Sequence, residues 1–94
     1  MSTTHPHQLS LPQELLDDAD ARELARIWFS EERQTLLIDA RVIDAPEVWG
    51  LFALDLMKHA ARAYAQRGGV SKEDAYKRML AMFAAEMKNP TEPL

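Results

Sequence analysis

The longest stretch with a regular helical pattern of apolar positions is residues 44–67. At about 100° per residue, these positions form an arc that covers more than half of the helix circumference. An arc this wide predicts that other elements cover the helix from two sides. Asp44 and Glu47 have the spacing of a capping box at its start, and Gly68-Gly69 predicts its end, because glycine readily adopts positive φ.

A second helix is predicted directly after these glycines. Ser71 and Asp74 again have a capping-box spacing, and Pro90 ends the pattern. The short connection predicts that the two helices pack as an antiparallel pair. The apolar positions follow the helical spacing i, i+3, i+4, i+7 and i+11, at Tyr76, Met79, Leu80, Phe83 and Met87, while Lys77, Arg78 and Lys88 face away.

The aromatic residues and most methionines are interpreted as core. Their spacing on the predicted elements is typical of buried positions, and methionine fills irregular gaps well. Methionine also occurs at adaptable binding surfaces, so a binding role stays open for this set. The methionines concerned are Met57, Met79, Met82 and Met87.

The segment before the first helix predicts a β-hairpin. Residues 34–40 are rich in β-forming residues, with Leu36 and Ile38 on one side of the strand. A single strand would leave its backbone N–H and C=O groups unpaired. Residues 23–29 are the nearest partner, although their pattern also fits a helix, and the polar residues 30–33 have the length of a hairpin loop.

The expected fold class is therefore α+β, a β-hairpin packed on an antiparallel pair of α-helices. Residues 1–12 are expected to form a disordered arm, residues 13–89 a single domain, and residues 90–94 a tail. A two-stranded hairpin is marginally stable, and its edges attract another chain. Two hairpins joined edge to edge across a two-fold axis would give a homodimer with a shared sheet.

Composition excludes several classes of protein. The 94 residues include no cysteine, so there is no disulfide framework, no thiolate nucleophile and no cysteine-based zinc site. No apolar run approaches the roughly 20 residues of a membrane span, and the first residues lack the features of a secretory signal. We expect a soluble cytoplasmic protein with no membrane partner. A chain this short buries a modest fraction of its surface, and association is a common remedy.

The charge distribution argues against a dedicated nucleic-acid binder. Net charge is −4, with four arginines against ten acidic residues in the first 50 positions and seven basic against five acidic residues in the rest. Affinity for nucleic acid depends on neutralising phosphates, which an acidic chain does poorly. The residues that would serve such a role are Lys58, Arg62, Lys77 and Arg78, and binding through them would depend steeply on salt.

Asp55 and His59 form the one pair with a pattern suited to catalysis. At i, i+4 on a helix, the carboxylate can hydrogen-bond the imidazole and raise its basicity. No serine has a recognisable nucleophile setting, and both residues project onto the polar stripe of the helix, which is typical of a solvated surface. There is no phosphate-binding loop and no metal-ligand cluster, so no cofactor and no metal are expected.

These observations favour a non-enzymatic, homodimeric interaction or regulatory module. The alternative is a small-molecule binder or minor enzyme that uses Asp55, His59 and neighbouring Arg62. A pocket that reaches an inward-pointing His59 would favour the alternative, and a fully hydrated stripe would favour the interaction module.

Several short motifs follow one another along the chain: Arg26-Ile27-Trp28, Trp49-Gly50, Asp55 and His59, Ala63-Tyr64, and Asn89-Pro90-Thr91. In this order they resemble a small bacterial family of domains of unknown function, over about residues 20–92. The resemblance implies a hairpin, because members often have glycines between the two strands, where this chain has Ser30-Glu31-Glu32-Arg33. It implies no activity and no site residues.

Overall fold

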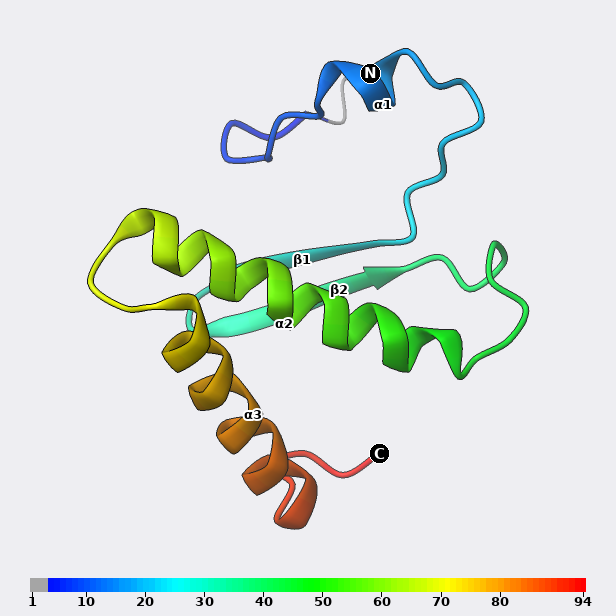
Figure 1. The fold of residues 1–94 in the computed structure, drawn as a ribbon. Helices are drawn as coiled ribbons and strands as arrows, with labels where there is room; N and C mark the ends of the chain where they lie inside the picture. The colour runs from blue at the N-terminus through cyan, green and yellow to red at the C-terminus, as the bar shows by residue number, and fades with distance from the viewer. Residues whose placement is uncertain (1–3) are drawn as a thin grey trace. The chain divides into compact units, whose positions relative to one another are not determined.

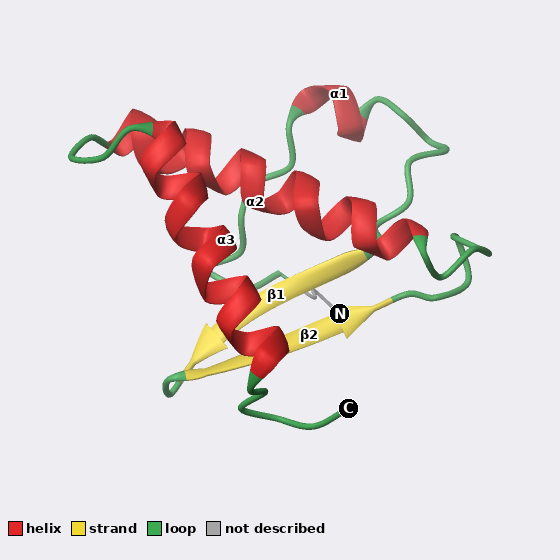
Figure 2. Ribbon diagram, turned by 60° about the horizontal axis from the view of Figure 1, so that its bottom comes forward, coloured by secondary structure: helices red, strands yellow, loops and turns green. Residues whose placement is uncertain are grey.

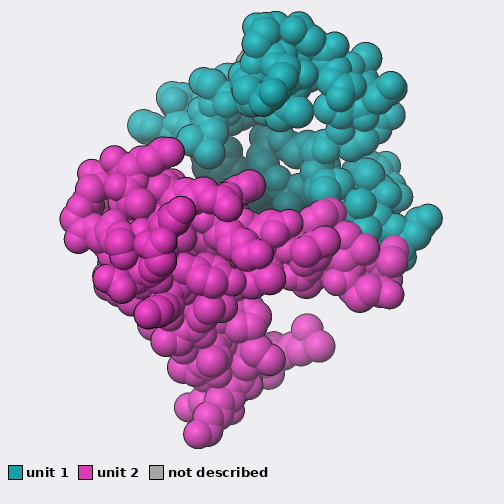
Figure 3. Space-filling view, viewed as in Figure 1, with its two compact units in different colours: residues 1–44 teal, residues 45–94 magenta. Residues whose placement is uncertain are grey.

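A computed structural model describes residues 4–94 of the chain. The chain divides into two compact units, residues 1–44 and 45–94 (Figure 3). The predicted α+β class is confirmed, because a β-hairpin and helices are both present (Figure 2). No helix among the described residues has the length and apolar character needed to cross a membrane. The elements are α1 (Gln13–Leu16), β1 (Ala25–Ser30), β2 (Arg33–Ile38), α2 (Val48–Arg67) and α3 (Lys72–Lys88) (Figure 1).

Strands β1 and β2 pair antiparallel in a two-stranded sheet, with Ser30 opposite Arg33 next to the turn. Beyond the far end of the strands, the Asp39 N–H donates to the Leu24 carbonyl at 2.9 Å. The strand interpretation of residues 23–29 is therefore confirmed and the helix alternative is wrong. The extended form is favoured because the backbone groups that point from each strand towards the other find partners there.

A two-residue turn joins the strands. Its residues, Glu31 and Glu32, both have positive φ, 52° and 60°. Positive φ at both central positions defines a type I′ turn, whose twist matches that of the flanking strands. Glutamate has a Cβ that disfavours this conformation by roughly 1–2 kcal/mol per residue. The chain thus keeps a tight hairpin turn without glycine, at the expense of backbone strain.

The two faces of the hairpin differ in what lies on them. Trp28 is half-buried, and the ring of His5 lies edge-on against it, with 4.9 Å between the centroids and 68° between the planes. The described part of the N-terminal segment therefore contacts the hairpin. Side chains alternate between the faces of a strand. The face opposite Trp28 carries large apolar side chains that stay exposed: Ile27, Phe29, Leu36 and Ile38.

Helix α2 starts from a backbone turn. The Val48 N–H donates to the Ala45 carbonyl at 3.1 Å and the Gly50 N–H donates to the Glu47 carbonyl at 3.0 Å. The capping box predicted for Asp44 and Glu47 is wrong, because Glu47 has helical backbone angles and no side chain caps the helix. In this turn, backbone carbonyls three residues earlier accept the hydrogen bonds of the first N–H groups. A capping side chain would otherwise accept these bonds.

The connection between α2 and α3 follows the prediction. Gly68 and Gly69 have φ of 97° and 95°, a region that disfavours residues with a Cβ. The Ser71 side chain accepts a hydrogen bond from the Asp74 N–H at 3.1 Å and so caps the start of α3. Both signals act locally, which explains why the sequence alone locates this connection correctly.

The two long helices contact each other through small residues. Ala61 and Ala75 are 3% and 6% exposed, and they are the only buried side chains among residues 4–94. The chain reverses direction at the glycine connection. From there α2 and α3 diverge, so that their far ends lie well apart (Figures 1 and 2). The predicted helix pair is present but splayed, so α3 covers α2 over only part of its length.

Candidate functional site

The residues predicted for chemistry lie on α2. Asp55 and His59 are exposed, and no hydrogen bond joins them in the described part of the chain. Arg62 lines a shallow hollow of about 200 Å³ where α2 meets α3, together with Lys58 and Lys72. The structure thus brings Arg62 close to two lysines, whereas neither Asp55 nor His59 lines this hollow.

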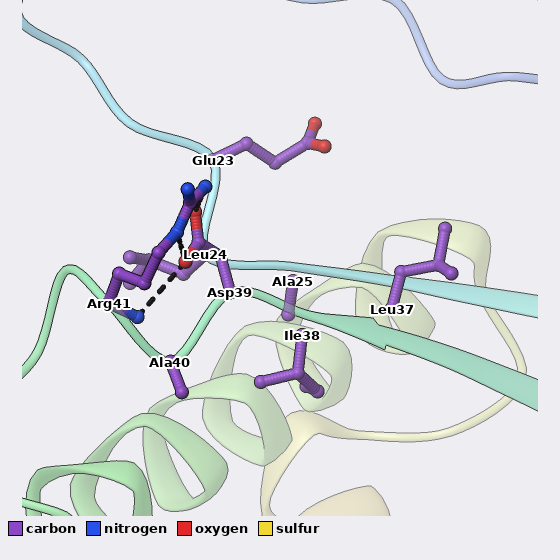
Figure 4. A pocket seen from close by; sticks show the side chains of 8 residues that line it. All are labelled: Glu23, Leu24, Ala25, Leu37, Ile38, Asp39, Ala40 and Arg41. Carbon is purple, nitrogen blue, oxygen red and sulfur yellow. Dashed lines mark hydrogen bonds and ion pairs between the residues drawn. The ribbon is translucent and has the colours of Figure 1, made fainter.

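A bidentate ion pair follows β2. Arg41 donates from Nε to Asp39 Oδ1 and from Nη2 to Oδ2, both at 2.9 Å, and its backbone N–H donates to Oδ1 at 3.0 Å (Figure 4). These bonds, led by the one from the Arg41 side chain, lower the pKa of Asp39 to about 2. The pair lines an open depression of about 540 Å³, in which Glu23 points away from it (Figure 4). Each ion already has its partner, so the pair stabilises the end of the hairpin.

The Asp39–Arg41 ion pair was not predicted, although the sequence contains a pattern typical of it. An aspartate that bonds the backbone N–H two residues later forms an Asx-turn, a common motif after a strand. Asp39-Ala40-Arg41 has that form. Arg41 then adds its guanidinium to the same carboxylate.

We expect an NMR titration of the Asp39 carboxyl carbon to give a pKa of about 2. The folded pKa is below the unfolded value of about 3.9, so the contribution of the pair to stability is complete above about pH 4 and is lost as the pH falls through 2. Arg41→Ala should raise the pKa towards the ordinary aspartate range. Arg33→Ala, at the other end of the hairpin, should leave it unchanged. A wild-type pKa near 3.9 would contradict the pairing.

An apolar groove of about 630 Å³ lies between α2 and α3. Its apolar lining consists of Met57, Tyr64, Val70, Ala75, Met79, Met82 and Phe83. Arg78 and Glu86, both on α3, also line it. The position of Arg78 differs from the prediction, which placed it on the far side of the helix.

The core interpretation is wrong for several side chains of this region. Met82 is 72% exposed, Met87 70% and Phe83 47%. The physical reason is the divergence of the helices: α2 moves away from the second half of α3 and leaves its apolar row uncovered (Figure 1). The binding-surface interpretation of the methionines therefore gains support from Met82, which lines the groove.

The chain beyond α3 folds back onto Glu86. The Thr91 N–H donates to Glu86 Oε1 at 2.8 Å, and the Thr91 hydroxyl donates to Oε2 at 3.0 Å. Both bonds lower the pKa of Glu86, with the side-chain bond having the larger effect, and so favour its ionised form. The Asn89-Pro90-Thr91 motif thus has a local structural role, which its sequence did not reveal.

The hairpin and the splayed helix pair define a small α+β domain with an apolar groove between its two long helices. The chain belongs to the family of domains of unknown function DUF5076, whose family model matches residues 8–91. The resemblance inferred from the short motifs is thereby confirmed at the level of the family.

One solved structure with the same fold is 33% identical in sequence, with a TM-score of 0.74 over 97% of this chain and 93% of that chain. It is described as a "putative pyruvate dehydrogenase" from the photosynthetic bacterium Rhodopseudomonas palustrus. No curated protein matches this chain.

Proposed function

We propose that this protein is a non-enzymatic interaction or regulatory module that acts as a homodimer. The observation that carries the proposal is its exposed surface, 8899 Å². A compact monomer of 10.7 kDa exposes about 5500 Å² by the general scaling with mass. Two separate compact units of half that mass would together expose about 6600 Å². The exposed surface is therefore about 2300 Å² above the larger of these two references, and segments outside the helices and strands, such as residues 17–24, contribute to it along with the apolar side chains.

Many large apolar side chains are exposed. Phe29 and Met82 are 76% and 72% exposed, and both unit 1 (residues 1–44) and unit 2 (residues 45–94) carry further large apolar side chains of this kind. Where such side chains gather within one unit, as Met82 and Phe83 do along the groove, they usually mark an interaction site. A standard interface removes about 800 Å² from each partner, which is well within the excess.

We expect a native mass of about 21 kDa, twice the chain mass of 10.7 kDa, in size-exclusion chromatography with light scattering over a dilution series. His59→Ala is the matched control. This exposed residue belongs, with Asp55 and Arg62, to the alternative small-molecule role, and it does not line the groove. Its replacement should leave the mass unchanged. A mass of 10.7 kDa throughout the micromolar range would overturn the proposal.

The description of the solved relative names a different activity for that protein. Pyruvate decarboxylation draws on a thiamine cofactor to stabilise a carbanion, and nucleotide-like diphosphates are held by glycine-rich loops or divalent cations. No three His, Cys, Asp or Glu side chains in residues 4–94 are grouped to hold a metal. Gly50 lies within α2, and Gly68-Gly69 ends it. None of these features supports carrying the activity named for that protein over to this chain.

A further inference from the structure

We propose that two copies associate through α3, packed antiparallel across a two-fold axis next to Met82, with α3 of each copy seated in the α2–α3 groove of the other. This inference rests on the proposed self-association and names its surface. The groove is open and apolar, and α3 itself carries the exposed apolar row that would fill it. A methionine-rich groove adapts well to a second helix.

Three residues of α3 define the packing surface. Arg78, Met82 and Glu86 follow one another at intervals of four, line the groove and are exposed. Residues four apart form a ridge on a helix, and interdigitation of such ridges is the commonest form of helix packing. Arg78 and Glu86 are about 12 Å apart along the axis at 1.5 Å per residue. Met82 lies midway between them.

The charges on this ridge are complementary under a two-fold operation. A two-fold axis at Met82 reverses the helix direction, so Arg78 lies opposite the partner's Glu86, and the partner's Arg78 lies opposite Glu86. The placement of Arg78 and Glu86 on either side of Met82 thus gives two equivalent ion pairs, as a two-fold symmetric interface requires. A parallel arrangement would instead place like charges together, which is unfavourable. The pattern therefore selects the antiparallel arrangement of a second copy.

Thr91 orders the Glu86 carboxylate, which forms the ion pair with Arg78 of the second copy. It bonds both carboxylate oxygens, at 2.8 and 3.0 Å, from the chain beyond α3. Each carboxylate oxygen has a further lone pair that can accept from an arginine of the partner. A side chain that is already ordered loses less conformational entropy on binding. The Asn89-Pro90-Thr91 ending is accordingly a positioning element for the interface.

A charge-reversal cycle tests the arrangement. Arg78→Glu and Glu86→Arg each place like charges opposite one another, and we expect each to raise the dissociation constant of the dimer at least tenfold, measured by sedimentation over a dilution series. The double variant restores opposite charges and should recover most of the affinity. Lys77→Glu is the matched control, with the same charge change next to Arg78 outside the groove lining, and should change the constant less than twofold.

The outcomes separate the two proposals. A monomeric wild type overturns the homodimer itself. A dimeric wild type with unchanged single variants, or a double variant weaker than both, overturns the α3 interface alone and favours association through another surface, such as the hairpin edges. Circular dichroism of each variant verifies that the helices are retained, and Thr91→Val, which removes one bond to Glu86, should weaken the dimer less than Glu86→Arg does.

Cysteine cross-linking locates the axis independently, because the chain has no cysteine of its own. Met82→Cys places two thiols next to the axis, where a mild thiol oxidant should join them in a disulfide-linked dimer. Met87→Cys is a control of similar exposure on the same helix. Its two copies would lie about 15 Å apart along the axis, beyond the ~7 Å limit between Cα atoms in a disulfide. Equal cross-linking at both positions, or none at Met82, would overturn the α3 arrangement.

Discussion

Replacing Glu31 and Glu32 with Asn and Gly should stabilise the β-hairpin by about 1–3 kcal/mol. Both positions have positive φ, 52° and 60°, in a type I′ turn. Asn-Gly is the preferred sequence for that turn, because glycine has no Cβ and asparagine tolerates the left-handed region. The substitution keeps the turn geometry and removes its strain. No other described residue with a side chain has positive φ, so the effect is specific to this turn.

Hydrogen exchange at the far end of the hairpin provides the measurement. The Asp39 N–H donates to the Leu24 carbonyl at 2.9 Å and reports opening of the strands. A gain of 1.4 kcal/mol corresponds to tenfold slower exchange. The control variant carries Gln at both positions, which removes the two negative charges but keeps side chains that disfavour positive φ. It should exchange much as the wild type does. Equal slowing in both variants would attribute the effect to charge instead of strain.

The parts of the fold that were predictable depend on local chemistry. The hairpin followed from the need of residues 34–40 for a backbone partner, and the connection after α2 followed from Gly68-Gly69 and the Ser71 cap. In each case the signal and its structural consequence lie within a few residues of each other. The capping box at Asp44 failed despite the right spacing, because a backbone turn from Ala45 already satisfied the first N–H groups.

The candidate site was less predictable, because a helical period identifies an apolar face without identifying what covers it. Met82 and Met87 have the spacing of core residues, yet they are 72% and 70% exposed once α3 diverges from α2. The divergence depends on how two helices meet at Ala61 and Ala75, which no local pattern specifies. For the same reason, the sequence did not indicate that Arg78 would line the groove.

The contact between α2 and α3 gives the second large prediction: Ala61→Leu should destabilise the helix pair by about 1–3 kcal/mol. Ala61 is 3% exposed where α2 meets α3, so most of the added methylene groups would meet neighbouring side chains before they reach the hollow of about 200 Å³ that this residue also lines. Overpacking of this kind forces backbone shifts or unfavourable rotamers. A 1 kcal/mol loss lowers the melting temperature of a domain this size by about 4–8 °C.

Ala63→Leu is the matched control for this substitution, because Ala63 is exposed on the same helix. Alanine and leucine have similar helix propensities, and surface substitutions usually change stability by less than about 0.5 kcal/mol. Thermal unfolding followed by circular dichroism should therefore separate the two variants clearly. Similar melting temperatures for both would mean that α2 and α3 do not meet closely at Ala61. The splayed geometry, and with it the open groove along α3, would then need another cause.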